Sequence, residues 1–138
     1  MSGRKGKAGR RGAAPVGCPC GLPGAYDGCC GRFHSGGAVA ASAEVLMRSR
    51  YSAFVKRDEG YLLRTWHPRT RPGRVEFDPG MRWTGLEIVR ARDGSAFHAT
   101  GVVEFRASFR GGVLHERSRF ERVDGVWVYV DGEFPDAS

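Results

Sequence analysis

The sequence predicts an α+β protein in which two helices precede a curved antiparallel sheet. Three observations support this assignment. Between residues 42 and 66, apolar residues recur at steps of three and four, which is the helical period. From Arg82 onwards the period changes to two, as in strands. Three dipeptides, Asp93-Gly94, Gly111-Gly112 and Asp124-Gly125, then divide this region into four strands joined by tight hairpins. Helices followed by such a meander form an α+β roll, with the helices on one face of the sheet.

The first helix is expected to begin at Ser42, whose hydroxyl can accept a hydrogen bond from a free amide of the first turn. Glu44 follows in that turn, where a negative charge is favoured by the helix dipole. Arg50 falls among the apolar positions, which is typical of a long side chain at the edge of a buried face. The apolar positions are Leu46, Met47, Tyr51, Phe54 and Val55.

A second, shorter helix is predicted from its cap Asp58 through Trp66, and Pro68 ends it. Prolines and glycines are then frequent over residues 67–80, so an irregular connection is expected there, with a short strand at residues 74–77.

Counting back from the three turns predicts which side chains share a face of the sheet, provided that no strand is bulged. The expected strands are 83–92, 95–110, 113–123 and 126–133, with Val103 opposite Phe120 and Phe120 opposite Tyr129. The face expected to pack on the helices carries Leu86, Ile88, Phe97, Ala99, Val103, Phe105, Ala107, Phe109, Leu114, Phe120 and Tyr129. The solvated face carries Glu87, Thr100, Glu104, Arg106, Arg117, Arg119 and Glu121.

The same count places three polar side chains on the apolar face, and residues from the helices can face them. The candidate pocket residues are Arg50, Trp66, His67, Glu116, Ser118 and Asp131. Glu133 is expected opposite Glu116, and crowded buried carboxylates are unfavourable unless they are paired or protonated. Two simpler interpretations stay open. The acids lie near strand ends and are solvated, or Arg50 neutralises them; a slip of one residue would move them all to the solvated face.

All four cysteines lie within residues 18–30, as Cys18-Pro19-Cys20 and Cys29-Cys30. Four thiolates complete a tetrahedral zinc site with Zn–S bonds of about 2.3 Å, and the glycines and prolines between the pairs suit a tight knuckle. The alternatives are free thiols, or two disulfides between the pairs in an oxidising compartment. His34 could replace Cys30 as a ligand, but with four thiols present we expect it to be a bystander.

Charge is unevenly distributed along the 138 residues. Residues 1–15 hold five of the 22 basic residues and no acid, so the rest of the chain contributes only +2 to the net charge of +7. This basic tail is expected to be disordered. It suits contact with RNA or the ribosome, or it is a solvated leader of no specific role. No apolar run approaches the roughly 20 residues of a membrane span, and no signal peptide is visible, so a cytoplasmic protein is expected.

The cysteine segment resembles the SEC-C zinc motif, known from the C-terminal tail of the protein-export ATPase SecA. It has Cys-Pro-Cys-Gly, then Tyr26, then Cys-Cys-Gly; the family's usual Gly-Ser-Gly is replaced by Gly21-Leu22-Pro23. With Arg32-Phe33-His34, residues 46–54 and Thr65-Trp66-His67-Pro68, residues 16–134 are similar to the YchJ-like family of small uncharacterised bacterial proteins. The resemblance implies a SEC-C-like knuckle at 16–34 and a cone-shaped roll, like nuclear transport factor 2 (NTF2), at 42–134. The implied zinc ligands are Cys18, Cys20, Cys29 and Cys30.

Three functions are compatible with these features. The first is a zinc-binding adaptor that docks on a protein partner through its knuckle, as the SecA knuckle does; four thiolates leave no open position, so the zinc is structural. The second is an isomerase, dehydratase or hydrolase that uses the pocket acids, although no catalytic motif establishes an enzyme. The third is an RNA- or ribosome-associated protein that uses the tail. Since residues 35–41 are rich in Gly and Ala, the knuckle is expected to make few contacts with the roll and to fold separately.

Overall fold

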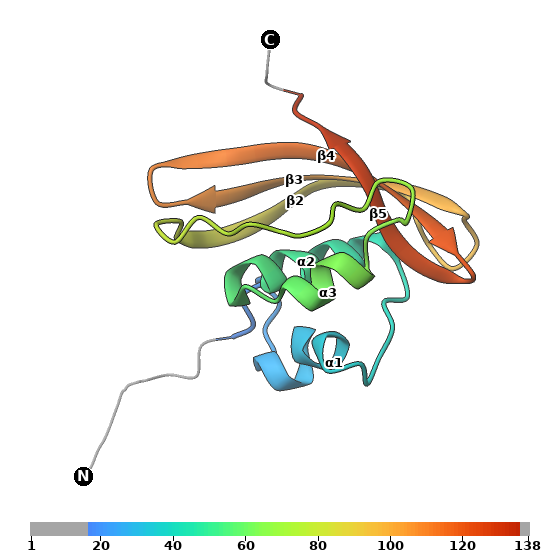
Figure 1. Cartoon of the computed structure of the whole chain (residues 1–138), viewed down its shortest axis with the longest axis horizontal. Helices are drawn as coiled ribbons and strands as arrows, with labels where there is room; N and C mark the ends of the chain where they lie inside the picture. Colours follow the sequence, from blue (N-terminus) through green and yellow to red (C-terminus); the bar gives the residue numbers. More distant parts are fainter. Residues whose placement is uncertain (1–16, 136–138) are drawn as a thin grey trace.

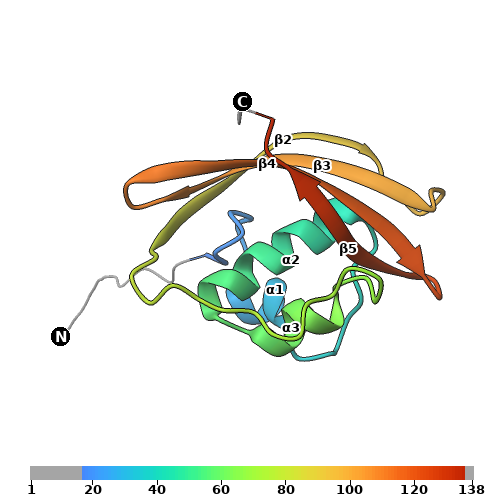
Figure 2. The same ribbon diagram turned by 45° about the horizontal axis from the view of Figure 1, so that its top comes forward.

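The computed structural model describes residues 17–135 and has the predicted α+β architecture. An N-terminal unit that contains the cysteines lies against two helices, and a four-stranded antiparallel sheet curves over the other side of those helices (Figures 1 and 2). The sheet order β2-β3-β4-β5 is a simple meander. The elements are η1 (Tyr26–Gly28), α1 (Cys30–His34), α2 (Ala43–Lys56), α3 (Glu59–Arg64), β2 (Trp83–Asp93), β3 (Thr100–Phe109), β4 (Gly112–Val123) and β5 (Val126–Glu133).

Helices α2 and α3 both begin at the predicted N-cap residues. The Ser42 hydroxyl accepts from the Val45 amide at 3.2 Å, and the Asp58 carboxylate accepts from the Tyr61 amide at 3.1 Å. Beyond α3, the backbone at Trp66 runs beside Tyr129 of β5 in an isolated parallel bridge. Residues 67–82 contain no helix or strand, so the short strand expected at 74–77 does not form.

In the hairpin between β3 and β4, each side chain lies on the predicted face of the sheet but opposite a different residue from the one expected. Arg110-Gly111 forms the turn, so Gly101 rather than Val103 lies opposite Phe120. This register differs from the expected one by two residues. Because side chains alternate with a period of two, each one stays on its predicted face.

The connection between β2 and β3 is longer than predicted. It runs over residues 94–99 instead of a two-residue turn, and Phe97, expected on the apolar face, is 95% exposed there. The cause is a tertiary contact at Gly94. Its carbonyl accepts from the Ala43 amide at the start of α2 (2.9 Å), and a Cβ on Gly94 would lie 2.8 Å from the Cβ of Ala43. A residue without a side chain is therefore required at this position.

A β-bulge in the last strand overturns the prediction for its C-terminal half. Phe120 lies opposite Tyr129 as expected, but Arg119 lies opposite Asp131, so Val130 is the extra residue. Every residue after a bulge changes face. Asp131 therefore lies on the solvated face, and Gly132 takes the expected place of Asp131 opposite Ser118. Likewise, Glu133 does not face Glu116.

Helix α2 separates two hydrophobic clusters. The larger cluster packs α2 against the sheet, through Ala40, Ala43, Leu46, Met47, Tyr51, Val103, Phe105, Ala107, Phe120 and Trp127. In the smaller one, Phe33 of α1 packs on Ala53 of α2 and on Tyr61 and Leu62 of α3. The cysteine unit is thus joined to the helices through a buried apolar contact, and the expectation of few contacts between knuckle and roll is wrong.

Candidate metal centre and interior cavity

The four cysteines meet in one buried cluster. Their sulfur atoms all lie within 4.8 Å of one another, and Cys20 Sγ is 3.6 Å from Cys29 Sγ. In a tetrahedron with Zn–S bonds of about 2.3 Å the sulfurs are separated by about 3.8 Å. All four side chains are free thiols in the structure. Their geometry therefore fits a single metal ion with four sulfur ligands.

The electrostatics of the cluster also favour a cation. Burial opposes ionisation of Cys18, but hydrogen bonds from the Cys20 amide, the Ser52 hydroxyl and the Cys30 amide outweigh it and lower the pKa of the Cys18 thiol to about 7. Burial raises the pKa of the Cys20 thiol to about 11 and that of the Cys30 thiol further still. The Cys18 thiolate forms readily here, whereas ionising Cys20 and Cys30 as well is favoured only by a bound positive charge.

Helix α2 holds the cysteine cluster from one side. The Ser52 hydroxyl lies 3.6 Å from Cys18 Sγ, and the Arg48 carbonyl oxygen lies 3.7 Å from Cys30 Sγ. The Arg48 guanidinium also donates to the Cys20 carbonyl at 2.9 Å. Sequence reasoning missed these contacts, because nothing in the local pattern relates α2 to the cysteines.

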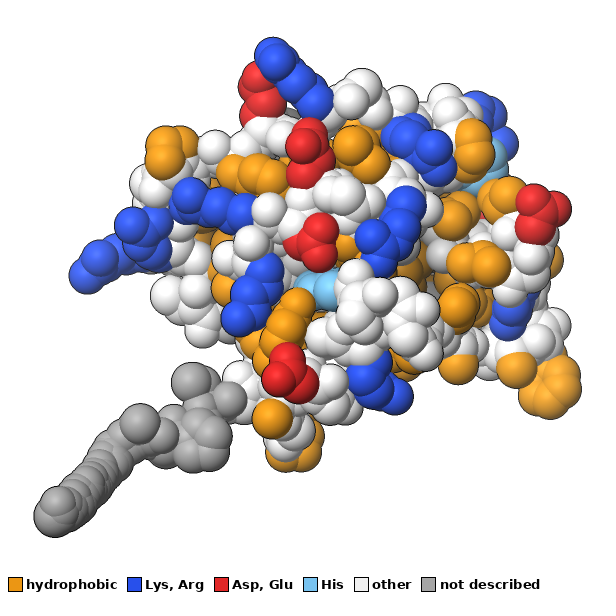
Figure 3. Space-filling view, turned by 60° about the horizontal axis from the view of Figure 1, so that its bottom comes forward, with side chains coloured by type: hydrophobic (Ala, Val, Ile, Leu, Met, Phe, Trp, Pro, Cys, Tyr) orange, Lys and Arg blue, Asp and Glu red, His pale blue; other side chains and the backbone are white. Residues whose placement is uncertain are grey.

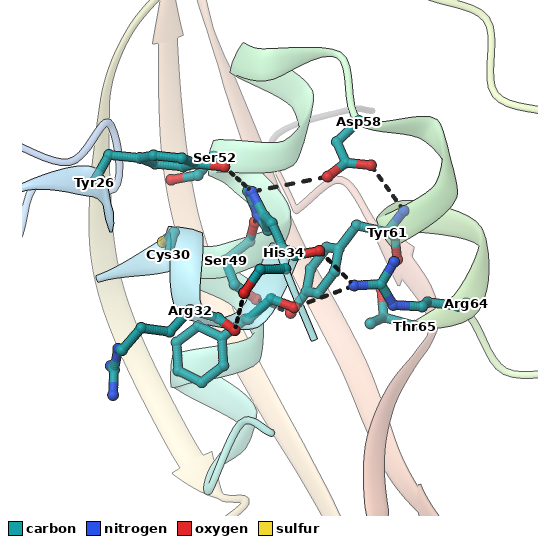
Figure 4. Close-up of polar contacts among 12 residues, drawn as sticks. Tyr26, Cys30, Arg32, His34, Ser49, Ser52, Asp58, Tyr61, Arg64 and Thr65 are labelled. Atoms are coloured by element: carbon teal, nitrogen blue, oxygen red, sulfur yellow. Dashed lines mark hydrogen bonds and ion pairs between the residues drawn. The ribbon is translucent and has the colours of Figure 1, made fainter. Parts of the chain in front are cut away.

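His34 belongs to a separate polar network (Figure 4). Its Nδ1 is 2.6 Å from the Tyr26 hydroxyl, and its Nε2 is 2.8 Å from the Ser49 carbonyl oxygen. Both ring nitrogens therefore have partners, and the Asp58 carboxylate lies 3.9 Å from Nδ1. Arg64 of α3 donates to the His34 carbonyl at 2.8 Å, which ties the end of α1 to the roll. These bonds give His34 a structural role.

A cavity of about 140 Å³ lies between α2 and the concave face of the sheet. Its lining is mostly aromatic and aliphatic, with a few polar groups at one end. The lining residues are Met47, Arg50, Tyr51, Phe54, Trp66, Trp83, Phe105, Ala107, Leu114, Glu116, Ser118 and Tyr129.

Arg50 is the buried cation of the cavity, and 3% of its surface is exposed. Its Nη1 donates to the Leu62 carbonyl (2.8 Å) and to the Thr65 hydroxyl (2.7 Å). The guanidinium carbon lies 4.9 Å from the ring centroid of Trp66 and 4.6 Å from that of Tyr129, so cation–π contacts also hold it. Burial lowers the pKa of Arg50 to about 10, which leaves it charged at neutral pH.

Glu116 is the acid of the cavity, and three neighbours position it. Its Oε2 accepts from the Ser118 hydroxyl at 2.7 Å and from the Tyr129 hydroxyl at 3.1 Å. Burial and then the Glu116 carboxylate raise the pKa of the Tyr129 hydroxyl far above its usual range, so Tyr129 remains a donor. A Cβ on Gly132 would lie 2.1 Å from Oε2, so the carboxylate occupies the space that this glycine leaves open.

The structure brings four of the six candidate pocket residues together, namely Arg50, Trp66, Glu116 and Ser118. The other two lie elsewhere. The Asp131 carboxylate accepts from the Arg119 guanidinium on the solvated face, at 2.6 Å for the Nε bond, because of the bulge at Val130. His67 Nε2 lies 3.3 Å from Glu121 Oε1, outside the cavity.

Two cavity groups were missed from the sequence. Tyr129 was assigned only a place on the apolar face, although its hydroxyl reaches Glu116. Gly132 was not considered, although a glycine inside a strand often marks a bulge or a close approach.

These features define a protein in which a four-cysteine cluster is joined to an α+β domain of two helices and a curved antiparallel sheet. Residues 42–132 match the family model described as "YchJ, middle NTF2-like domain". The chain therefore belongs to the YchJ-like family. It is 72% identical to a UPF0225 protein of Streptomyces avermitilis over 120 residues, which are 87% of this chain and 86% of the relative. It is also 72% identical to the UPF0225 protein SCO1677 of Streptomyces coelicolor over 119 residues, 86% of this chain and 96% of that one.

Two solved structures share this fold. The SEC-C motif containing protein RPA3114 of Rhodopseudomonas palustris is similar with a TM-score of 0.74 and 34% identity, over 86% of this chain and 98% of that one. A SEC-C motif containing protein of Psychrobacter arcticus is similar with a TM-score of 0.67 and 29% identity, over 88% of this chain and 82% of that one.

The surface gives little further information on function. On the face that Figure 3 shows, Lys and Arg side chains are interspersed with acidic and hydrophobic ones. None of the helices within residues 17–135 is long and apolar enough to cross a membrane. The predicted basic tail, residues 1–15, lies outside the described residues.

Proposed function

We propose that this protein binds a small molecule in the cavity of its roll, and that a structural zinc ion in the cysteine cluster holds one wall of that cavity in place. The observation that carries the proposal is the composition of the cavity. An apolar chamber with a few convergent polar groups, one of them a buried arginine, is the usual form of a small-molecule site.

The size of the chamber indicates how large a group it can take up. Its volume of about 140 Å³ is close to that of an engineered cavity of about 150 Å³ that binds benzene in another protein. The expected ligand is therefore a compact molecule built around one ring or one branched chain.

The zinc ion would act through helix α2. Zinc is the metal that four-cysteine structural sites usually hold, and such sites have no open position for substrate. One side of α2 contacts the cluster through Ser52 and Arg48, and another side lines the cavity through Met47, Arg50 and Tyr51. Zinc would thus order a helix that the binding site needs.

A cavity-filling variant tests the binding proposal. Ala107 lines the cavity, and Ala107→Leu should fill part of it while the protein stays folded. Native mass spectrometry of the zinc-loaded protein from its host should detect a bound small molecule in the wild type and much less in this variant. Ser108→Leu, at the next position of β3, is the matched control and should retain the molecule. Equal occupancy in the wild type and the Ala107→Leu variant would contradict a site in the cavity.

Docking of a protein partner on the cysteine unit is a second candidate function. The observation in its favour is that residues 21–25 are exposed next to the buried sulfurs, with Leu22 42% exposed. Leu22→Ser should abolish capture of a partner by the zinc-loaded protein, whereas Val39→Ser, at another exposed position, should not. Loss of capture in both variants, or in neither, would count against this docking surface.

A further inference from the structure

We infer that the ligand of the cavity carries an uncharged head group with one hydrogen-bond acceptor and one donor, as in a primary amide, on a small apolar ring. The inference rests on the proposed function and assigns its ligand class. Three separate observations at the polar end of the cavity lead to it: unused donors on Arg50, an unused acceptor on Glu116, and a balance of charge.

The donor group is the buried guanidinium of Arg50. Within residues 17–135 its only hydrogen bonds run from Nη1, to Leu62 and Thr65, so Nε and Nη2 have no protein acceptor. No carboxylate of the described chain lies within ion-pair distance of it, although Arg50 lines the cavity. The two Nη1 bonds and the two aromatic rings hold the guanidinium in one position, so its free edge is ready to meet an acceptor.

The indole ring of Trp66 lies beside this donor. Its nitrogen is fully buried and has no hydrogen-bond partner among the described residues. Trp66 lines the same cavity, and its ring lies against the Arg50 guanidinium. Because this nitrogen is closed off from the cavity, it is not one of the donors that meet a ligand; Trp66 serves the site by holding the Arg50 guanidinium with its ring.

The acceptor is the second oxygen of Glu116. Both bonds that position this carboxylate, from Ser118 and Tyr129, go to Oε2. Oε1 has no donor among the described residues, so it can receive an N–H from a ligand. The polar end therefore offers donors and an acceptor together.

The charge balance decides between neutral and charged head groups. Arg50 and Glu116 are the only formally charged residues that line the cavity. A ligand carboxylate would meet Arg50 but be repelled by Glu116, and a ligand ammonium would meet Glu116 but be repelled by Arg50. A neutral amide can accept from the arginine side and donate to Glu116 without adding charge to a desolvated site.

Four probes of the same ring and nearly the same size separate these possibilities: benzamide, benzoate, benzylamine and toluene. Binding is measured with the zinc-loaded full-length protein by titration of its amide NMR spectrum at pH 7. For the wild type we expect benzamide to bind more tightly than the two charged probes by on the order of tenfold, since each of those is repelled by one of the two charged residues that line the cavity. Toluene should bind weakly, through the apolar lining alone.

Glu116→Gln provides the internal test, because it removes one negative charge and keeps a hydrogen-bonding side chain. The site then has a net positive charge, so benzoate should become the tightest probe. Glu121→Gln, the same change on the same strand outside the cavity, should leave the order unchanged. The spectrum of each variant also shows whether it is folded.

The outcomes separate the ligand class from the existence of the site. If benzoate or benzylamine binds the wild type best, or if Glu116→Gln does not change the order, the uncharged head group is wrong while a small-molecule site remains. If no probe binds, toluene included, the cavity is not a site for ring compounds, and both this inference and the proposed function fail.

Discussion

Gly132→Ala tests how the carboxylate of Glu116 is held. The new Cβ would lie 2.1 Å from Oε2 and 2.7 Å from Cδ, far closer than atoms of these kinds can approach. The backbone of Gly132 is outside the left-handed region, so alanine itself is not strained there. Because the clash is with the end of a flexible side chain, we expect the carboxylate to move and the strand to stay.

The magnitude follows from the bonds that break. Displacement removes the hydrogen bonds from Ser118 and Tyr129 and leaves the buried Ser118 hydroxyl without its acceptor, which costs about 1–3 kcal/mol. Replacing glycine by alanine returns about 0.4–1 kcal/mol by restricting the unfolded chain. The expected net loss in the free energy of unfolding is about 1–2 kcal/mol.

The assay is urea denaturation of four proteins: the wild type, Gly132→Ala, Glu116→Ala and the double variant. In the Glu116→Ala background the carboxylate is absent, so Gly132→Ala should be neutral or stabilising by up to about 1 kcal/mol. The two positions should therefore be coupled by about 2 kcal/mol. An equal loss of stability in both backgrounds would show that the new Cβ disturbs the strand itself, and would refute this account of the site.

Four further outcomes are expected. The purified protein should hold one zinc per chain, and a chelator should lower the melting temperature of the sheet as well as that of the cysteine unit; an unchanged melting curve for the sheet would mean that the two units are independent. Asp131→Asn should change the free energy of unfolding by less than about 0.5 kcal/mol at pH 7, because its pair with Arg119 is exposed. The Arg119 hydrogen bond lowers the pKa of Asp131, so the small contribution of this pair is present above the ordinary carboxyl pKa and should be lost as the pH falls through the lowered value. Phe97→Ser should also cost less than about 0.5 kcal/mol, and a loss above about 2 kcal/mol would place Phe97 in the core. Deleting residues 1–14 should leave the melting temperature unchanged and weaken any RNA binding most at low salt; unaltered RNA binding after the deletion would place the site in the rest of the chain.

Periodicity was sufficient to predict helices α2 and α3, the meander and most of the division between the two faces of the sheet, but not the short helices η1 and α1. The two-residue difference in register between β3 and β4 did not affect the predicted faces, because side chains alternate between the faces with a period of two. The position of Asp131 could not be predicted by counting residues from the turn. The bulge at Val130 shifts the register by one residue, and the turn sequence does not indicate a bulge. Gly132 was the one residue in the sequence that indicated this bulge, since a glycine within a strand often marks a bulge or leaves room for a neighbouring side chain.

The contacts that the sequence concealed are tertiary. Asp93-Gly94 is typical of a two-residue hairpin turn. Here the contact of Gly94 with the first turn of α2 gives a longer loop between β2 and β3. Phe33 stands in a polar, glycine-rich stretch, and only the fold brings it to Tyr61 and Leu62. In the same way, the contacts between α2 and the cysteine cluster join positions up to 34 residues apart, beyond the reach of any local pattern.

The place of α2 between the cysteine cluster and the sheet has a consequence for synthesis on the ribosome. The chain emerges from its N-terminus, so the four cysteines leave the exit tunnel before the helix that buries them. Until Arg48, Ser52 and then Leu62 have followed, the thiols and Phe33 are open to water, to metal ions and to oxidants. A metal ion that binds the four thiols could therefore be captured on the nascent chain, and completion of α2 and α3 would then close the cluster before the last strand has been made.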